Sequence, residues 1–188
     1  MSTLRFEVPF YIYKVDDHIR LKPILLDMIE KAEGHQSVRS YERLGKTDWY
    51  LNVAHKDFMR RFISNSDETY YSVLKPHIEN IIDSVLPEDD KSNIYVYHGW
   101  YNQYLTMNHY FYHAHFGAKW AMVYYLELPI NGPKTEFENF FGDPIVPNVD
   151  EGDILIFPAW IKHRSPHNKS MDRKTIIAFN LAEKESTV

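Results

Sequence analysis

The chain has 188 residues, a net charge of -5 and no cysteine, and 44% of its residues are hydrophobic. This length suits one domain with a substantial core, so we expect a single domain over residues 1–188. The absence of cysteine excludes disulfides and thiolate metal ligands, which leaves nitrogen and oxygen ligands for any metal. Because the charge is acidic and no basic stripe is present, we expect no nucleic-acid partner.

No stretch of the sequence approaches the ~20 apolar residues that a membrane-spanning helix needs. The N-terminus also lacks a basic segment followed by an apolar one, which a secretory signal would show. We therefore expect no membrane partner and a cytoplasmic location. The sequence leaves the oligomeric state open.

Residues 1–92 carry the patterns of one strand and several helices. Residues 6–15 are rich in aromatic and β-branched residues, and Pro9 within them favours an edge strand. Residues 22–33 have apolar side chains at helical spacing, and Gly34 provides a stop.

Two further helices are predicted in the same half of the chain. Residues 55–63 favour a short helix. Polar residues at 65–68 offer cap chemistry for a longer one, whose apolar positions recur at helical spacing up to Pro87. Pro76 lies inside that pattern, so we expect a kink there.

From residue 93 onward the pattern changes to β. The expected strands are residues 94–104, 110–116, 120–128, 153–157 and 175–181, and turn signals rich in glycine and proline separate them. Helices followed by several short strands predict an α+β fold, in which the helices buttress a β-sandwich or barrel.

Three histidines in the β-region are the candidate metal ligands. His113 and His115 are two residues apart on a predicted strand and would face the same side of it. His163 directly follows a short apolar run, where a strand would end. A lone histidine on an apolar strand is more often structural, and His-x-His is a weak motif. The three together, in this order, predict a metal site.

Arg173 and Thr175 are the candidate anion-binding residues. They open the last predicted strand and would share one face of it. A guanidinium beside a hydroxyl can hold a carboxylate in a fixed orientation. The competing interpretation is an ordinary solvated arginine, which is the commoner fate of this residue type.

The sequence resembles a known family. The order His-x-His, Gly-Asp-Ile-Leu-Ile-Phe-Pro, His and Arg-x-Thr resembles the core of the Fe(II)/2-oxoglutarate-dependent dioxygenases. More narrowly, it resembles a poorly characterised bacterial and phage subgroup. The motifs that carry this narrower resemblance are Lys-Thr-Asp-Trp at 46–49, Trp100-x-Asn102, His113-x-His115, Val-Tyr-Tyr-Leu at 123–126, the run at 152–158 and Phe179-Asn180.

The resemblance covers residues 46–182 in scattered motifs and implies a fold. That fold is a double-stranded β-helix, a jelly-roll or cupin-like core, over residues 93–182. Residues 1–92 would supply the N-terminal strand and the helices that buttress the core.

The resemblance also implies residue roles. His113 and His163 match the two histidine ligands of Fe(II) in the family. Arg173 matches the basic residue that pairs with the distal carboxylate of 2-oxoglutarate, and Thr175 would add a hydroxyl to the same carboxylate.

Two further residues are candidates for binding the cosubstrate. Tyr125 lies where prolyl-hydroxylase-like members have a tyrosine that reaches 2-oxoglutarate, and Asn102 could assist from a neighbouring strand. A tyrosine on a sheet face is, however, more often a packing residue. The implied activity uses Fe(II), 2-oxoglutarate and O2 to hydroxylate an unidentified small-molecule or peptidyl substrate, with release of succinate and CO2.

His115 departs from the pattern of the family. Most members have a carboxylate at this position, whereas an imidazole would leave all protein ligands uncharged. Such a site should bind resting iron more weakly and attract anionic 2-oxoglutarate more strongly. Asp143 and Asp153 are the alternative sources of a carboxylate ligand, although both lie in sequences typical of turns. The sequence leaves the third ligand open.

Two alternatives remain at this stage. The first is a three-histidine, cupin-like dioxygenase that does not use 2-oxoglutarate, in which Arg173 would be a surface residue. The second is a non-catalytic β-sandwich that binds a ligand or a partner.

Overall fold

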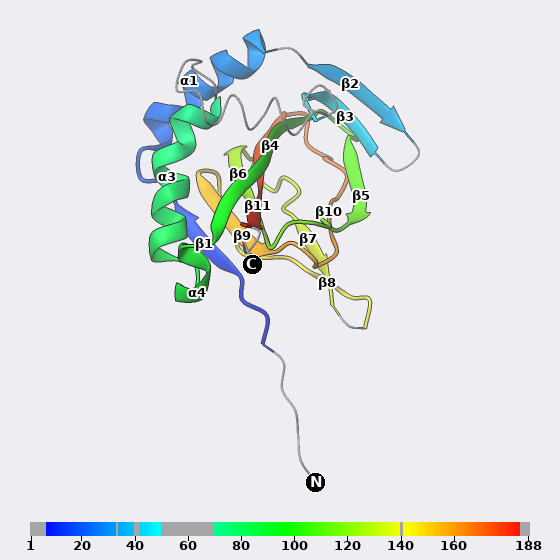
Figure 1. The fold of residues 1–188 in the computed structure, drawn as a ribbon. Coiled ribbons are helices and arrows are strands. Elements are labelled where there is room, and N and C mark those ends of the chain that lie inside the picture. Colours follow the sequence, from blue (N-terminus) through cyan, green and yellow to red (C-terminus); the bar gives the residue numbers. More distant parts are fainter. Residues whose placement is uncertain (1–6, 33, 40–41, 50–69, 140, 185–188) are drawn as a thin grey trace.

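The computed structural model describes residues 7–32, 34–39, 42–49, 70–139 and 141–184 (Figure 1). The helices in these ranges are α1 (His18–Lys31), α3 (Tyr70–Ser84) and α4 (Glu88–Lys91). The short helix predicted at 55–63 and the cap residues predicted at 65–68 lie outside the described residues. No helix among the described residues is long and apolar enough to span a membrane.

Both long helices are amphipathic, and each buries one face against the sheet. α1 begins four residues before the predicted start, so that Pro23 lies inside the helix and not in its first turn, where the predicted bounds would put it. Its buried side chains are Leu21, Leu25 and Ile29. α3 continues through Pro76, as predicted, and buries Tyr70, Tyr71, Leu74, Ile78 and Ile81. Each fully buried aliphatic side chain of this size contributes roughly 1.5–3 kcal/mol to folding.

The described strands form one sheet in which all pairings are antiparallel. They are β1 (Tyr11–Lys14), β2 (His35–Arg39), β3 (Glu42–Thr47), β4 (Ile94–Tyr104), β5 (His109–His113), β6 (Trp120–Glu127), β7 (Glu136–Glu138), β8 (Pro144–Ile145), β9 (Asp153–Pro158), β10 (His163–Ser165) and β11 (Lys174–Glu183). The order is β1-β9-β6-β11-β4-β3-β5-β10-β7-β8, with β2 paired to β3. β1 is therefore an edge strand, as Pro9 predicts.

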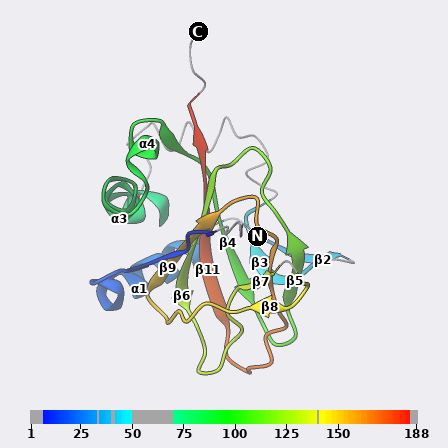
Figure 2. The ribbon, with the colours of Figure 1, turned by 90° about the horizontal axis from the view of Figure 1, so that it is seen from below.

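The sheet curls so that its two halves face each other. The helices cover the outer face of the β9-β6-β11-β4 half, and β5, β10, β7 and β8 lie across the opposite face (Figures 1 and 2). The apolar residues accordingly form two clusters, one under the helices and one between the halves of the sheet. On β11, Ile177 and Phe179 belong to the first cluster and Ile176 to the second. The predicted double-stranded β-helix with supporting helices is confirmed.

The first half of the chain contributes more strands than its sequence indicates. The β2–β3 hairpin was not predicted, because its residues are mostly polar and lack a strand-like alternation. β3 pairs with both β4 and β5, so it belongs to the sheet that carries the histidines. Pairing with other strands, and not a local sequence pattern, therefore gives this hairpin its strand conformation.

The short strands near the histidines also differ from the prediction. β7, β8 and β10 have two or three residues each, too few to show a pattern. β5 ends at His113 and not at residue 116. The reason is that the backbone N–H of His115 donates to the carbonyl oxygen of Ala159 (2.9 Å), which takes this segment out of the β5 ladder.

Candidate active site

The structure brings the three candidate histidines together. His113, the last residue of β5, is paired in register with His163, the first residue of β10. His115 follows two residues after β5, and its ring centroid lies 5.0 Å from those of the other two. One ligand nitrogen from each ring lies within 4.8 Å of the others. Three separate sequence positions therefore present nitrogen atoms to one small volume.

Hydrogen bonds fix the orientation of two of these rings. Nδ1 of His113 lies 2.8 Å from the carbonyl oxygen of Phe111, and Nδ1 of His163 lies 2.9 Å from that of Ile161. Because a carbonyl only accepts, both Nδ1 atoms carry the hydrogen, and each Nε2 presents a lone pair. Nε2 of His163 lies 3.2 Å from Nε2 of His115. A divalent cation shared by these lone pairs is the chemistry that this donor set fits.

Burial keeps the three imidazoles neutral. Desolvation lowers the pKa of His163 well below its ordinary value and that of His115 to about 3, and the neighbouring histidines add to both shifts. Desolvation also lowers the pKa of His113, against the opposing effect of Glu42, a buried carboxylate that lines the same cavity. Neutral imidazole is the form that binds a metal, so the cluster is ready to accept Fe, Zn, Ni or Cu ions.

The two aspartates considered as a third ligand lie elsewhere. Asp143 is exposed in the turn before β8, where its backbone N–H donates to Oδ1 of Asn139 (2.8 Å). Asp153 is buried, and its Oδ2 accepts the backbone N–H of Asp150 (2.7 Å). Among the described residues, the metal-compatible cluster contains the three histidines and no carboxylate.

The histidines line a cavity of about 420 Å³ between the two halves of the sheet. Alternate residues of β11 form one wall of it, namely Lys174, Ile176, Ala178 and Asn180. The cavity also contains Asn102, whose Oδ1 accepts a hydrogen bond from Oγ1 of Thr47 (2.6 Å). The period of two along β11 explains why these side chains share one face.

Lys174 is the fully buried basic residue of this cavity, which Arg164, paired with Glu136, also lines. Its side chain is fully buried, with 1% exposure, and Nζ donates to Oγ of Ser165 (2.9 Å). Nζ also lies over the rings of Tyr104 and Tyr125, at 5.0 and 5.8 Å from their centroids. Burial lowers the pKa of Lys174 to about 7. Within the described ranges, no carboxylate forms an ion pair with Lys174. Glu42, a carboxylate that also lines the cavity, pairs with Arg39 and accepts a hydrogen bond from the hydroxyl of Ser37.

The hydroxyl of Tyr125 is engaged with Thr135. It donates to Oγ1 of Thr135 (2.7 Å) and accepts the backbone N–H of the same residue (3.2 Å). Thr135 lines the cavity, whereas Tyr125 lies behind it. We use the term anion pocket for the polar end of the cavity formed by Lys174, Ser165, Tyr104 and Thr135.

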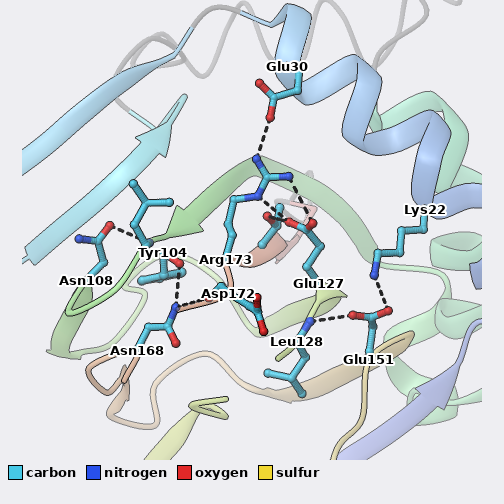
Figure 3. Close-up of polar contacts among 12 residues, drawn as sticks. Lys22, Glu30, Tyr104, Asn108, Glu127, Leu128, Glu151, Asn168, Asp172 and Arg173 are labelled. Carbon is cyan, nitrogen blue, oxygen red and sulfur yellow. Dashed lines mark hydrogen bonds and ion pairs between the residues drawn. The ribbon is translucent and has the colours of Figure 1, made fainter. Parts of the chain in front are cut away.

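Arg173 and Thr175 lie on the other face of the strand from Lys174, outside the cavity. Figure 3 shows Arg173 beside Glu127 and Glu30. Nε and Nη2 of Arg173 donate to the carboxylate of Glu127 on β6 at 2.8 and 3.2 Å, and Nη1 donates to Glu30 of α1 at 2.7 Å. The hydroxyl of Thr175 donates to the same carboxylate of Glu127. The structure therefore does not bring these two residues to the histidines.

Lys174 was not identified from the sequence, although a signal for it is present. Arg173-x-Thr175 fits the pattern of the family, and this fit favours the odd-numbered residues of the strand as the ones that face the site. Asn180 and Lys174 have the same parity on the strand, so a cavity that includes Asn180 also includes Lys174. The signal for Lys174 in the sequence is therefore its even-numbered position, which it shares with Asn180 of the Phe179-Asn180 motif.

The end of the cavity beside His115 is aromatic. The ring of Trp100 stacks on His115, with centroids 5.6 Å apart and planes at 20°. Trp49 contacts Trp100 and His98 at 4.3 and 4.7 Å between centroids. The cavity therefore has a polar end at Lys174 and a flat, aromatic end at Trp100.

Comparisons with known proteins bear on the fold. The sequence matches no family model and no curated protein. Solved structures do match: a prolyl hydroxylase from Trichoplax adhaerens, in complex with a hypoxia inducible factor peptide, has a TM-score of 0.67 and 12% identity, covering 93% of this chain and 83% of that one. The chain has the fold of the 2-oxoglutarate- and iron-dependent oxygenases. This agrees with the resemblance seen in the sequence.

Two other structures with this oxygenase fold illustrate its range. A 2OG-Fe(II) oxygenase family member from Burkholderia pseudomallei has a TM-score of 0.59 and 9% identity, covering 92% of this chain and 85% of that one. SnoN, a non-heme alpha ketoglutarate dependent epimerase from nogalamycin biosynthesis, has a TM-score of 0.64 and 10% identity, with 94% and 78% coverage. Since the activities named for these proteins differ, the oxygenase fold leaves the reaction open.

Proposed function

We propose that the protein is an Fe(II)- and 2-oxoglutarate-dependent oxygenase. His113, His115 and His163 are assigned as the metal ligands, and Lys174 as the group that binds the distal carboxylate of 2-oxoglutarate. The fold supports this proposal, and so does the donor set of three neutral imidazoles. The observation that carries it is the buried side chain of Lys174 in the cavity that the histidines line.

The position of Lys174 suits a short dicarboxylate. Its hydrogen-bond partner Ser165 lies two residues after His163 on β10, which corresponds to ~7 Å along a strand. A five-carbon dicarboxylate can bridge this span, with one end at the histidine cluster and the other at the ammonium. Burial disfavours the charged form of Lys174, and an anionic ligand beside Nζ would favour it.

The roles of the protein groups follow from this arrangement. Iron would supply O2 activation and the oxidation of the substrate that is coupled to decarboxylation of 2-oxoglutarate to succinate and CO2. Lys174 and Ser165 orient the cosubstrate. The three uncharged ligands leave the charge of the cation largely uncompensated by its own ligands, which favours an anionic cosubstrate. At the end of the cavity away from Lys174, the side chains of Trp49 and Trp100 exclude water.

We assign hydroxylation as the reaction and a small molecule or a peptidyl side chain as the substrate class. Asn102 is retained as a cavity residue that can contact the cosubstrate. Tyr125 is assigned an indirect role, because its hydroxyl orients Thr135 at the anion pocket. For Arg173 and Thr175 we propose a structural role instead of the clamp first expected, given their contacts with Glu127.

The test is an anaerobic titration with Fe(II) followed by 2-oxoglutarate. We expect one metal site and the weak visible absorption of an iron–2-oxoglutarate chelate, followed by succinate formation when O2 is admitted. Metal binding without this absorption or succinate would favour the cupin-like dioxygenase. A protein that binds no divalent metal would instead be the non-catalytic binding module.

A further inference from the structure

His115 differs from the other two histidines in how its ring is held. Nδ1 of His113 and Nδ1 of His163 each donate to the carbonyl oxygen of the residue two positions earlier. In the described part of the chain, the ring of His115 has no such bond to the backbone, and its Nε2 faces Nε2 of His163. The ring that departs from the family pattern is therefore also the ring without a backbone acceptor.

Asn180 is the polar side chain next to this ring. It lies on the cavity face of β11, six residues from Lys174, between Ala121 of β6 and His98 of β4. It is 95% buried, being 5% exposed, and its Oδ1 has no hydrogen-bond partner of ordinary geometry within the described ranges. An unsatisfied buried acceptor is destabilising and calls for an explanation.

The chemistry of coordination supplies the missing donor. If Nε2 of His115 binds a cation, the hydrogen of the neutral ring must reside on Nδ1. An acceptor for that N–H would hold the half-buried ring in place, in the same way that backbone carbonyls hold the rings of His113 and His163. The side-chain amide of Asn180 already lies within hydrogen-bonding reach of the His115 ring. The side-chain carbonyl oxygen of Asn180 would be the acceptor for His115, as backbone carbonyl oxygens are for His113 and His163.

We propose that Oδ1 of Asn180 accepts the hydrogen bond from Nδ1 of His115 and so acts as the positioning residue that makes His115 the third metal ligand. This inference rests on the proposed metal site. It gives a physical reason why an imidazole can replace a carboxylate here, because a partner outside the coordination sphere fixes the tautomer and the orientation of the ring.

The test uses Zn(II) as a redox-silent probe and two matched variants of the full chain. Asn180→Leu keeps the approximate size and removes the acceptor, whereas Asn180→Asp retains an acceptor. Competition with a chromophoric chelator should show ~10–100-fold weaker zinc binding for Asn180→Leu, and wild-type or tighter binding for Asn180→Asp. Thermal unfolding verifies that each variant folds, and Asn180→Ala replaces the leucine variant if that one does not.

A second readout distinguishes positioning from packing. In the zinc-bound protein, ¹H–¹⁵N spectra of the histidine rings report each Nδ1–H. We expect the signal of His115 to shift or to be lost by solvent exchange in Asn180→Leu. The signals of His113 and His163 should stay unchanged, because their acceptors are backbone carbonyls.

Two results would overturn the inference while leaving the metal site intact. One is wild-type zinc affinity with an unchanged His115 signal in Asn180→Leu. The other is an equal loss of affinity in the leucine and aspartate variants, which would indicate packing only. Wild-type protein that binds no zinc would overturn the proposed function itself and this inference with it.

Discussion

Arg173 and Lys174 are adjacent in the chain but direct their charges to opposite sides of the sheet. The guanidinium of Arg173 pairs with Glu127 and Glu30 and so ties α1 to β6 (Figure 3). The ammonium of Lys174 is buried in the cavity with Ser165. Two neighbouring cations therefore have separate physical roles, one between a helix and the sheet and one in the anion pocket.

The first prediction compares Lys174→Met with Arg173→Met. A hydrogen bond to a charged group is worth ~1.5–3 kcal/mol, so Lys174→Met should weaken 2-oxoglutarate binding by roughly 10–100-fold or more. Arg173→Met should leave that affinity within about threefold, because its guanidinium is outside the cavity. Calorimetric titration of the zinc-loaded protein with 2-oxoglutarate measures both. The reverse order of effects would restore Arg173 as the clamp.

The second prediction concerns pH. Because burial lowers the pKa of Lys174 to about 7, the empty pocket holds mostly neutral lysine above that pH. An anionic ligand favours the ammonium, so binding of 2-oxoglutarate at pH 8 should take up a proton, and affinity should fall as pH rises from 7 to 9. Burial raises the pKa of Tyr104 and Tyr125, so these hydroxyls stay protonated throughout.

Titrations at pH 8 in buffers of different ionisation enthalpy measure this uptake. Lys174→Met should remove it, and a wild-type value of zero would contradict the assignment. The same shift affects stability without ligand. The unfolded chain binds more protons at this lysine between pH 7 and 10.5, so its contribution to the free energy of unfolding should rise with pH over that interval. The difference between wild type and Lys174→Met in chemical denaturation isolates this contribution.

The third prediction concerns the contact between α1 and the sheet. Arg173→Met leaves the mostly buried carboxylate of Glu127 without its guanidinium partner, which should cost about 1–2 kcal/mol. For a chain of this length the melting temperature should fall by ~2–8 °C. Glu30→Gln is the matched control, because Glu30 is 56% exposed and its pair should contribute under ~1 kcal/mol. Equal losses in the two variants would show that Glu127 is not the main anchor.

The fourth prediction concerns the third ligand. His115→Asp places a carboxylate at the same position, so Fe(II) affinity should rise and succinate formation should be retained. His163→Ala should abolish the tight site, because its nitrogen is the most buried of the three. Asp143→Ala should bind metal like the wild type, since its backbone N–H and carboxylate contact Asn139 in an exposed turn. Loss of metal binding in Asp143→Ala would require a different ligand set.

Local patterns in the sequence determined much of the fold. Helical spacing predicts α3, and strand-like runs predict β4, β6, β9 and β11 to within about two residues. These elements are long or strongly apolar, so burial dominates their conformation. The sequence also indicated His113, His115 and His163 as a group, because ligand chemistry is carried by residue type and by position at strand ends.

The tertiary structure alone decided how these elements meet. The β2–β3 hairpin and the short β7, β8 and β10 acquire their conformation from pairing with other strands, which no local period records. The side of β11 that faces the cavity was also undecided, since a strand exposes alternate residues to both sides and its sequence does not say which side is enclosed. In the structure, Lys174 and Asn180 line the cavity, whereas Arg173 contacts Glu30 of α1.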